Sequence, residues 1–503
     1  MSEPFLITTA ISYPNGRPHI GHAYEAIAGD VIARFQRGRG RDVRFVGGTD
    51  EHGLKMVQTA RAEGRDTLEF ADEMSRYFSE MAEKLDISYD AFVRTTEPRH
   101  HHASVAIWKA MEEAGDLYLD RYEGWYSVRD EAFYDESELV EGEAGVRLSP
   151  QGTPVEWTAE ETWFFRLSKY QEPLLRLYRE NPDFIRPDSR RNEVLRFVEA
   201  GLKDLSVSRT SFDWGVPVPN SPGHVMYVWV DALTTYMTGV GYPDDREQYN
   251  RFWPADVHLI GKDIVRFHTV YWPAFLMSAK LPLPTQVFGH GFLLSRGEKM
   301  SKSVGNVVDP MDLADRFGVD ALRYFLLREV PFGQDGSYSA EAIVNRANAE
   351  LANSFGNLAQ RTLSMIHKNL EGVLPEAGTE AADLALLQGV EQATSTEVPA
   401  AFERFAFSVG IEAWLRAVFA CNAYVDEQAP WTLRKTDPER MAAVLGTLVR
   451  ALRQLTAAIA PVIPGSAAKL KALIDAGEGG APIPAPTPLF PRLELPAEED
   501  AAA

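Results

Sequence analysis

Cysteine is almost absent from this chain of 503 residues, in which Cys421 is the only one. A single cysteine excludes an intrachain disulfide and any zinc site built from several thiolates. Long apolar runs are also absent: none approaches the roughly 20 residues of a membrane-spanning helix. Residues 1–4 lead into a strand-like run rather than a secretory signal. These absences predict a cytoplasmic protein without membrane contact and without structural zinc.

Basic residues are few. Lys and Arg number 51 against 72 Asp and Glu, so the formal net charge is −21. This balance argues against extensive non-specific phosphate binding, although a local basic surface on an acidic body is compatible with it. Arg186, Arg190, Arg191 and Arg196 are one candidate for such a surface, and a solvated helix face explains them equally well.

Residues 7–22, I-T-T-A-I-S-Y-P-N-G-R-P-H-I-G-H, organise the chain. Ile7–Ile11 predicts a central strand of a parallel sheet, and the Pro-Asn-Gly that follows predicts a turn. The next apolar residues recur with helical spacing on one face: Tyr24, Ile27, Ala28, Val31 and Phe35. His19 and His22 therefore lie at a helix N-terminus beyond the carboxyl end of a strand, where α/β sheets bind ligands and phosphate is favoured.

The two histidines flank Gly21, which lets a nucleotide approach the backbone closely. Their imidazoles can donate hydrogen bonds to a phosphate that gains charge in a transition state. Taken alone, this short motif is explained equally well by a capped helix whose histidines only satisfy local polar groups.

A second motif, K-M-S-K-S, occupies residues 299–303 between Gly297 and Gly305. Lys299 and Lys302 are flexible positive charges in a loop that can close over a triphosphate and neutralise the leaving pyrophosphate. Alone this could be a solvated basic turn, but its pairing with the histidine motif favours nucleotide chemistry. With both motifs intact, the sequence resembles a class I aminoacyl-tRNA synthetase and, in finer detail over nearly the whole chain, the methionyl-tRNA synthetase family.

The balance of 45% hydrophobic and 24% charged residues predicts a globular protein of two to four domains. After about residue 115, Tyr-, Trp-, Glu- and Gly-rich segments indicate a β-containing insertion, with helical patterns at Thr162–Arg179 and Asn192–Leu205. The chain returns to the sheet near Val225, and from Asp309 its pattern is almost wholly helical. We predict an α/β fold: a split Rossmann-type nucleotide-binding domain with a connective insertion, followed by an α-helical bundle, which the resemblance makes the anticodon-binding domain. The predicted parts are the first half of the catalytic domain (1–115), the insertion (116–224), the second half of the catalytic domain (225–295), the lysine loop and linker (296–339), the bundle (340–475) and a Pro-, Ala- and Glu-rich tail (476–503), which we expect to pack back locally.

Many methionyl enzymes carry a cysteine-ligated zinc knuckle in this insertion, but residues 120–160 contain no Cys and no His. We therefore expect a zinc-free insertion. At about 110 residues it must already fold as its own small unit, which leaves no room for the editing domain of the isoleucine, leucine and valine enzymes.

The resemblance implies that the methionine carboxylate attacks the α-phosphate of ATP, and that the aminoacyl group then passes to tRNA(Met), initiator tRNA included. Positioning and charge stabilisation drive such a reaction without a protein nucleophile. His19 and His22 are assigned to the α-phosphate, and Lys299 and Lys302 to the β- and γ-phosphates, with Mg²⁺ accompanying ATP.

The ATP site should also include glycines and one carboxylate. The resemblance implies that Gly21 lies beside the phosphates. It also implies that Gly261 and Asp263, in I-G-K-D-I, contact the ribose, where the Asp263 carboxylate would accept hydrogen bonds from the ribose hydroxyls. A helix N-cap is the alternative role for Asp263.

Methionine is unbranched and polarizable and packs well on aromatic rings, so its pocket needs aromatic walls and one polar anchor. The segments A-I-S-Y-P-N-G, Y-V-W-V-D-A-L-T-T-Y and G-K-D-I-V-R-F-H supply such residues. Asp50 is the implied partner of the α-ammonium group, and Leu233 departs from the Pro that the family commonly has there. The implied lining residues are Ile11, Tyr13, Trp229, Ala232, Tyr236, Ile264 and His268. Each aromatic residue alone is more often part of a core, so the set carries the assignment.

In the bundle, D-E-Q-A-P-W at Asp426–Trp431 matches the family's anticodon motif. Trp431 is assigned to stacking on an anticodon base, and Asn357 and Arg361, four apart on one helical face, to hydrogen bonds with base edges. A Trp buried between helices and a solvated Asn/Arg pair are the alternatives. No tRNA-binding barrel domain follows the bundle, and because related enzymes dimerise through that domain, we expect a monomer.

Three other functions share some of these sequence features. A synthetase for cysteine needs a cysteine-rich zinc site, and those for isoleucine, leucine and valine need an editing domain. A tRNA-independent adenylyltransferase can share H-x-G-H, but it is typically one small domain and leaves D-E-Q-A-P-W unexplained. A non-catalytic RNA-binding relative would be favoured by loss of a motif histidine or lysine, and all four are present.

Overall fold

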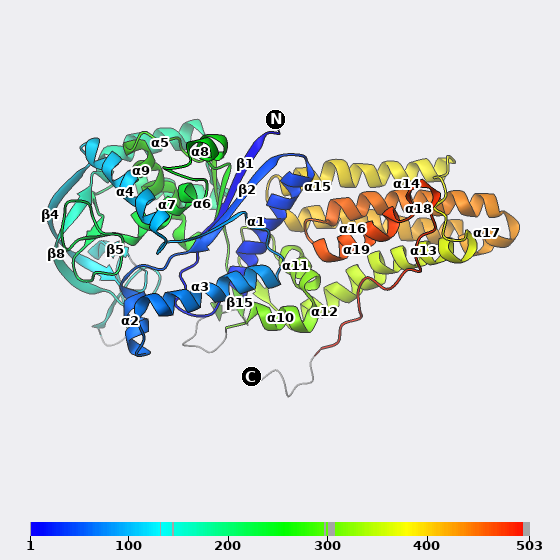
Figure 1. Cartoon of the computed structure of the whole chain (residues 1–503), viewed down its shortest axis with the longest axis horizontal. Helices are drawn as coiled ribbons and strands as arrows, with labels where there is room; N and C mark the ends of the chain where they lie inside the picture. The colour runs from blue at the N-terminus through cyan, green and yellow to red at the C-terminus, as the bar shows by residue number, and fades with distance from the viewer. Residues whose placement is uncertain (1, 131, 143–144, 296–297, 300–306, 496–503) are drawn as a thin grey trace. The chain divides into compact units, whose positions relative to one another are not determined.

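The computed structural model describes residues 2–130, 132–142, 145–295, 298–299 and 307–495, and the chain divides into two compact units (Figure 1). Unit 1 comprises Met1–Pro18, Gln36–Glu83 and Ile87–His290. Unit 2 comprises His19–Phe35, Lys84–Asp86 and Gly291–Ala503.

A parallel sheet forms the centre of unit 1, with β1 in the middle of the strand order β3-β2-β1-β13-β14-β9 among the described residues. Its strands are β1 (Pro4–Thr9), β2 (Asp42–Thr49), β3 (Ala91–Arg94), β9 (Ile185–Arg186), β13 (Val257–Gly261) and β14 (Gln286–His290). The predicted central strand is confirmed, but it ends at Thr9, before Ile11. After Thr9 the regular pairing of β1 with its neighbours ends. Only a hydrogen bond from Ala10 N to Leu259 O and an isolated bridge between Ser12 and Thr49 continue it, before the turn at Pro14.

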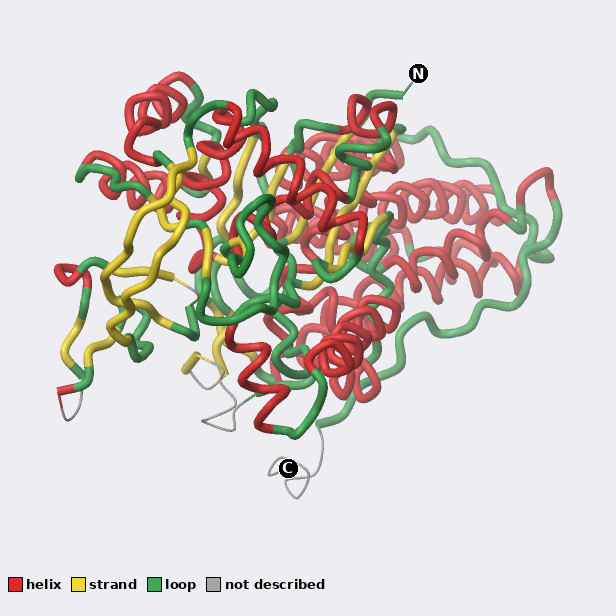
Figure 2. Tube along the Cα trace, turned by 60° about the vertical axis from the view of Figure 1, so that its left-hand side comes forward, coloured by secondary structure: helices red, strands yellow, loops and turns green. Residues whose placement is uncertain are grey.

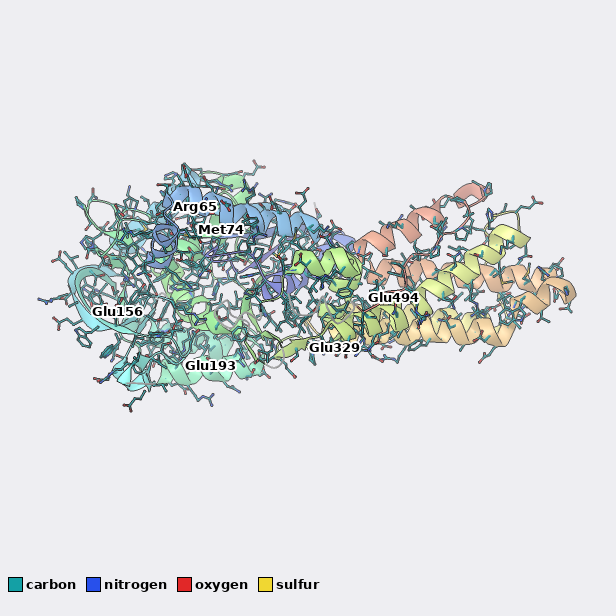
Figure 3. All side chains as sticks on the ribbon, turned by 90° about the horizontal axis from the view of Figure 1, so that it is seen from below. Arg65, Met74, Glu156, Glu193, Glu329 and Glu494 are labelled. Carbon is teal, nitrogen blue, oxygen red and sulfur yellow. The ribbon has the colours of Figure 1, made fainter. Side chains whose placement is uncertain are left out.

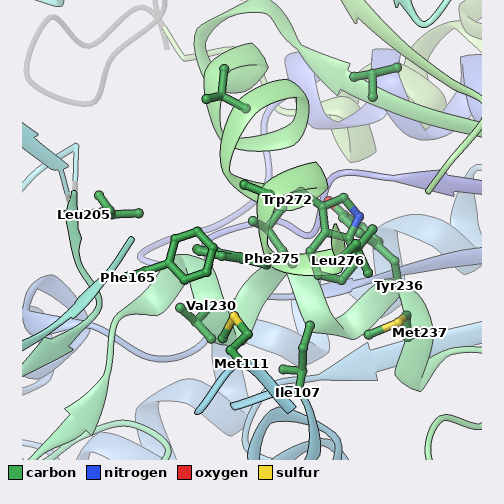
Figure 4. Packing of buried hydrophobic residues seen from close by; sticks show 14 of the residues in the cluster. Ile107, Met111, Phe165, Leu205, Val230, Tyr236, Met237, Trp272, Phe275 and Leu276 are labelled. Atoms are coloured by element: carbon green, nitrogen blue, oxygen red, sulfur yellow. The ribbon is translucent and has the colours of Figure 1, made fainter. Parts of the chain in front are cut away.

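Helices and short turns surround this sheet, beginning after β2 with α2 (Leu54–Ala62). The other helices of unit 1 are α3 (Thr67–Lys84), α4 (Pro98–Glu113), α5 (Gln171–Glu180), α6 (Asp188–Glu199), α7 (Val228–Thr238), α8 (Arg246–Phe252) and α9 (Trp272–Ser278), with turns η3 (Leu167–Tyr170), η4 (Lys262–Ile264) and η5 (Phe267–Tyr271). Their apolar faces build one large core, in which Figure 4 shows Ile107 of α4, Met237 of α7 and Phe275 of α9. A smaller cluster includes Met56 of α2 and Met74 of α3, the latter labelled in Figure 3.

The insertion contains β-structure as predicted, built on the long antiparallel pair β4 and β8. Its strands are β4 (Leu117–Ser127), β5 (Ala132–Tyr134), β6 (Val140–Glu141), β7 (Arg147–Leu148), β8 (Glu156–Phe165), β10 (Leu205–Ser206), β11 (Ser208–Arg209) and β12 (Val225–Met226), with a short turn η1 (Glu136–Glu138). The helix expected from Thr162 is wrong at its start: Thr162–Phe165 pairs with β4 inside β8, because consecutive aromatic side chains suit a strand.

The return to the sheet also needs a correction. Residues 228–238 form helix α7, and β12 pairs with β11 rather than with the central sheet. The chain rejoins the sheet earlier, at β9, within the range that the sequence assigns to the insertion. A two-residue strand leaves too short a pattern to be recognised in sequence.

Unit 2 is almost wholly helical, as Figure 2 shows in red. Its helices are α1 (Ile20–Gly38, with His19–Phe35 in this unit), α10 (Pro310–Phe317), α11 (Val319–Arg328), α12 (Ala340–Arg346), α13 (Asn357–Asn369), α14 (Ala381–Gln392), α15 (Val398–Phe402), α16 (Phe407–Gln428), α17 (Pro430–Thr436), α18 (Pro438–Ile459) and α19 (Pro464–Asp475), with π turns η6 (Ala347–Gly356) and η7 (Ala393–Glu397), a turn η8 (Glu478–Gly480) and the strands β15 (Leu293–Ser295), β16 (Glu298–Lys299) and β17 (Gly336–Tyr338). The predicted apolar face of α1 is buried, and its Tyr24 and Phe35 contact Phe332 and Phe402.

The described part of the tail packs back as expected. Asn348 exchanges two hydrogen bonds with the backbone of Leu493, and Phe490 lies against Phe355. Helix α18 is long and apolar enough to cross a membrane, but most of its apolar window is buried in the bundle, as in the core helix of a soluble protein.

Candidate functional site

The two motif histidines lie at the start of α1, as the sequence predicts. The Nδ1 atom of His19 accepts a hydrogen bond from Gly21 N at 3.0 Å, and the Nδ1 atom of His22 accepts one from His19 N at 3.0 Å. Each imidazole in its neutral form therefore carries its proton on Nε2. A Cβ atom at position 21 would lie 2.8 Å from the His19 ring, so a glycine is needed here to seat that ring.

The segment after the lysine motif lies beside these histidines within unit 2. Ile20 N, in the first turn of α1, donates to Val308 O at 2.9 Å. Lys299 belongs to β16, where its backbone pairs with Leu294. Lys302 lies outside the described residues. This backbone contact places Val308, six positions after Lys302 in the sequence, at the first turn of α1.

In unit 1, three residues predicted for the methionine pocket meet. The hydroxyl of Tyr236 lies 2.6 Å from Nε2 of His268, and the ring of Trp229 lies 5.9 Å from the His268 ring. Trp229 stacks flat on Phe267 at 3.9 Å between ring centroids. Buried Ala232 shares the face of α7 that carries Trp229 and Tyr236, so the aromatic set is confirmed as a cluster.

His268 is held as a neutral imidazole with a defined tautomer. Burial lowers its pKa from 6.5 to about 4. Its Nδ1 atom lies 3.0 Å from Ile264 O, which can only accept, so Nδ1 carries the proton and Nε2 accepts from the Tyr236 hydroxyl. The hydrogen bond from the Tyr236 hydroxyl to His268 therefore has one defined direction, and it lies among the aromatic side chains of this cluster.

Of the remaining predicted pocket residues, Ile11 and Ile264 pack against the same core as Trp229 and Tyr236. Ile11 is half-buried against the main core. The Tyr13 hydroxyl accepts from Met56 N at 2.9 Å, and Asp50 N donates to Ser12 O at 2.8 Å just beyond β2. Leu233 is fully buried in the main core and lies four residues after Trp229, on the same side of α7.

Gly261 and Asp263 follow each other closely at the carboxyl end of β13. Asp263 is exposed and lies inside η4, whose N-cap is Gly261. The N-cap role considered for Asp263 is therefore not observed. A Cβ atom on Gly261 would lie 2.8 Å from a carboxylate oxygen of Asp263, so the glycine leaves this carboxylate its place.

Sequence reasoning missed two buried groups. Asp231 of α7 bridges His52 and His100 at 2.5 and 2.6 Å. Arg209 is also buried, stacked on Phe133 at 4.3 Å, and its Nε and Nη2 atoms have no hydrogen-bond acceptor among the described residues. Isolated charged residues far apart in sequence carry no local signal. The one available hint was His52, two positions after Asp50.

In the bundle, the structure joins two of the three predicted anticodon residues. Trp431 is 46% exposed, which contradicts a Trp buried between helices. The guanidinium of Arg361 lies 5.4 Å from the centre of the Trp431 ring and 3.2 Å from Asp426. Asn357 is exposed one turn before Arg361 on α13. The arrangement presents an aromatic face next to a cation, which suits an unpaired base.

Comparison with protein families gives two matches. A model described as tRNA synthetases class I (M) matches residues 5–363. A model described as the anticodon binding domain of methionyl tRNA ligase matches residues 374–485. The two matches follow one another along the chain.

Similar proteins match at nearly full length. The methionine–tRNA ligase of Brucella suis is 57% identical, over 97% of this chain and 98% of that protein. The one of Mycobacterium tuberculosis strain H37Rv is 54% identical, over 98% and 99%. A crystal structure of the M. tuberculosis methionyl-tRNA synthetase bound by methionyl-adenylate superposes with a TM-score of 0.93, 54% identity and coverage of 97% of this chain and 100% of that one.

Proposed function

This chain belongs to the methionyl-tRNA synthetase family of class I synthetases, and from that premise we propose which of its residues perform each step. The enzyme activates methionine with ATP to methionyl-adenylate and charges tRNA. We propose that its substrates include the initiator tRNA, that it acts in the cytoplasm as a monomer, and that the bundle (340–475) is its anticodon-binding domain.

In adenylation, a carboxylate oxygen of methionine forms a bond to the α-phosphorus of ATP. The bond from that phosphorus to the bridging oxygen breaks, and pyrophosphate leaves with the electron pair. His19 and His22 donate from Nε2 to the phosphate as its charge grows, a role supported by the two Nδ1 acceptor bonds at the start of α1. Lys299 and Lys302 neutralise the β- and γ-phosphates. A terminal ribose hydroxyl of tRNA then attacks the carbonyl carbon, and AMP leaves.

Gly21, Gly261 and Asp263 complete the ATP site in this proposal, with Asp263 accepting from the ribose hydroxyls. Mg²⁺ would arrive on the ATP phosphates, because proteins usually bind this ion through substrate phosphates and one or two carboxylates rather than through a cage of protein ligands. Bound there, the ion supplies charge neutralisation. We propose no structural zinc, since a single cysteine cannot supply a thiolate set.

The methionine site is proposed on the Trp229–Tyr236–His268 cluster, the observation that carries this function. Its aromatic walls suit an unbranched thioether, and the Tyr236–His268 hydrogen bond satisfies the polar atoms of this wall within the protein. Asp50 takes the α-ammonium group. The other lining residues in this proposal are Ile11, Tyr13, Ala232 and Ile264.

We place anticodon recognition on Asn357, Arg361 and Trp431. Trp431 stacks on a base, and Arg361, next to it, donates to a base edge once the base displaces or shares its contact with Asp426. Asn357 contributes a second donor and acceptor from the same helical face.

The deciding experiment is methionine-dependent exchange of pyrophosphate into ATP, with Mg²⁺ and without tRNA, run beside isoleucine, leucine and cysteine. Exchange with methionine alone supports the proposed pocket together with the adenylation site. Exchange with another amino acid retains the synthetase class and contradicts the pocket. No exchange from a folded sample contradicts the assignment of the adenylation residues.

A further inference from the structure

Three buried ionisable side chains connect segments that carry the proposed methionine-binding residues. His52 follows Asp50 by two positions, and Asp231 lies on α7 between Trp229 and Ala232. The Asp231 carboxylate contacts His52 Nδ1 at 2.5 Å through Oδ2 and His100 Nε2 at 2.6 Å through Oδ1. Asp231 and His100 are at most 1% exposed and His52 is 4% exposed.

The hydrogen bonds define the protons in this cluster. A carboxylate only accepts, so His52 donates from Nδ1 and His100 from Nε2. Thr238 Oγ1 lies 2.9 Å from His100 Nδ1 and 3.2 Å from Thr234 O. Both ring nitrogens of His100 therefore have a hydrogen-bond partner, which fixes the orientation of the ring.

The surroundings agree with an ionised Asp231. Burial alone raises its pKa, but the positive charge and hydrogen bonds of His52 and His100 outweigh burial and hold the pKa well below its usual range. His101, whose ring centre lies 5.4 Å from that of His52, has a lowered pKa through burial and through the charge of His52. Glu51 beside His52 is ion-paired with Arg94, so it leaves the cluster's charge unchanged.

We propose that Asp231 is a positioning residue for methionine: through His52 it holds the Asp50 loop against α7, so that the ammonium partner and the aromatic wall stay in register. This inference rests on the proposed methionine site. A buried charged cluster contributes less to stability than apolar packing of the same volume. Its directed hydrogen bonds instead fix one relative position of the loop and the helix.

The test is the substitution Asp231→Asn, which keeps the shape but removes the charge and one acceptor. We expect the KM for methionine in pyrophosphate exchange to rise about tenfold or more, the effect of one lost buried charge-assisted hydrogen bond. The KM for ATP and kcat should stay within about twofold. His102→Asn is the matched control: His102 neighbours His100 and His101 on α4, is exposed and pairs only with Asp244 among the described residues.

Trp229→Ala, measured in parallel, separates this inference from the pocket on which it depends. If Trp229→Ala raises the methionine KM and Asp231→Asn does not, the positioning role is overturned and the pocket stands. If neither variant raises it, the pocket assignment fails and the inference fails with it. Should Asp231→Asn not fold, His52→Gln removes only the outer hydrogen bond, because its amide nitrogen reaches the Nε2 position rather than the Nδ1 position that donates to Asp231. A folded His52→Gln enzyme with unchanged methionine KM also overturns the proposal.

Discussion

At the residue scale, the hydrogen bonds of His22 lead to a directed prediction. Because its Nδ1 accepts from the backbone, only Nε2 can donate to phosphate. The side-chain amide nitrogen of Gln reaches close to the Nε2 position, whereas that of Asn reaches only the Nδ1 position. We expect His22→Asn to slow pyrophosphate exchange about 10²–10³-fold, the usual cost of one lost transition-state donor. His22→Gln should retain more activity. Equal losses in both variants would contradict the Nε2 role.

The pKa of a buried histidine also predicts the acid sensitivity of unit 1. His268 has a folded pKa of about 4, and burial and the charge of His268 lower the pKa of neighbouring His258 as well. Between about pH 6.5 and 4, the unfolded chain binds protons that the folded one does not, so stability falls as the pH falls. At pH 5, His268 should account for about 2 kcal/mol of that loss.

Thermal unfolding of the wild type and of His268→Gln at pH 7 and pH 5 measures this effect. Gln does not titrate, so the variant should lose fewer degrees of Tm between the two pH values, whatever its stability at pH 7. The same loss of Tm in both proteins would show that His268 does not contribute.

At the scale of elements, one arginine holds helices α1 and α11 together within unit 2. Arg323 is fully buried, pairs with Asp30 at 2.6 Å, and donates to the backbone carbonyls of Leu85, Pro461 and Val462. A lysine keeps the charge but not the planar fork of donors, so carbonyls are left unsatisfied. We expect Arg323→Lys to lower the free energy of unfolding by about 2 kcal/mol or more.

Denaturant unfolding of Arg323→Lys can be compared with Arg316→Lys, because Arg316 is exposed on the adjacent helix α10. The control substitution should change stability by less than about 0.5 kcal/mol. A loss of the same size in both variants would contradict the role of the buried fork.

The surface formed by α13, α16 and α17 predicts a separation of the two half-reactions. Trp431→Ala removes the exposed stacking face beside Arg361 and should raise the KM for tRNA about 10- to 100-fold, since one stacked base contributes about 1–3 kcal/mol. Pyrophosphate exchange without tRNA should be unchanged. Leu384→Ala, also an exposed apolar residue of the bundle, is the control and should affect neither reaction. An unchanged tRNA KM in Trp431→Ala would contradict the anticodon assignment.

At the scale of the whole molecule, the charge balance limits how tRNA is bound. The net charge is −21, and in the candidate basic surface Arg186 pairs with Asp183 and Asp188, and Arg190 with Glu193. These pairs reduce the positive charge that two of the four arginines offer to phosphate. We expect a plot of the logarithm of the tRNA KM against the logarithm of the salt concentration to have a slope of about 2–4. Each phosphate contact adds roughly 0.7–0.9 to this slope, so the expected value corresponds to a few contacts. The methionine KM, measured over the same salt range, is the control for salt effects that do not involve tRNA. A slope near 10 for the tRNA KM would contradict the expectation of few phosphate contacts.

The sequence by itself determined the chemistry and most of the local elements of this protein. The histidine and lysine motifs indicated the reaction, and the apolar period of α1 identified the face that is buried. The aromatic residues Trp229, Tyr236 and His268 were recognised as a set. These features depend on neighbours in the chain or on short motifs, so their physical requirements are visible in the order of residues.

Only the tertiary structure decided which distant residues meet. Asp231 lies 179 residues from His52 and 131 from His100, and no periodic pattern connects them. The place of β9 in the sheet likewise depends on pairing with β14, about 100 residues later in the chain. Long-range hydrogen bonds and strand pairs leave no local pattern in sequence, because their geometry exists only once the chain has folded.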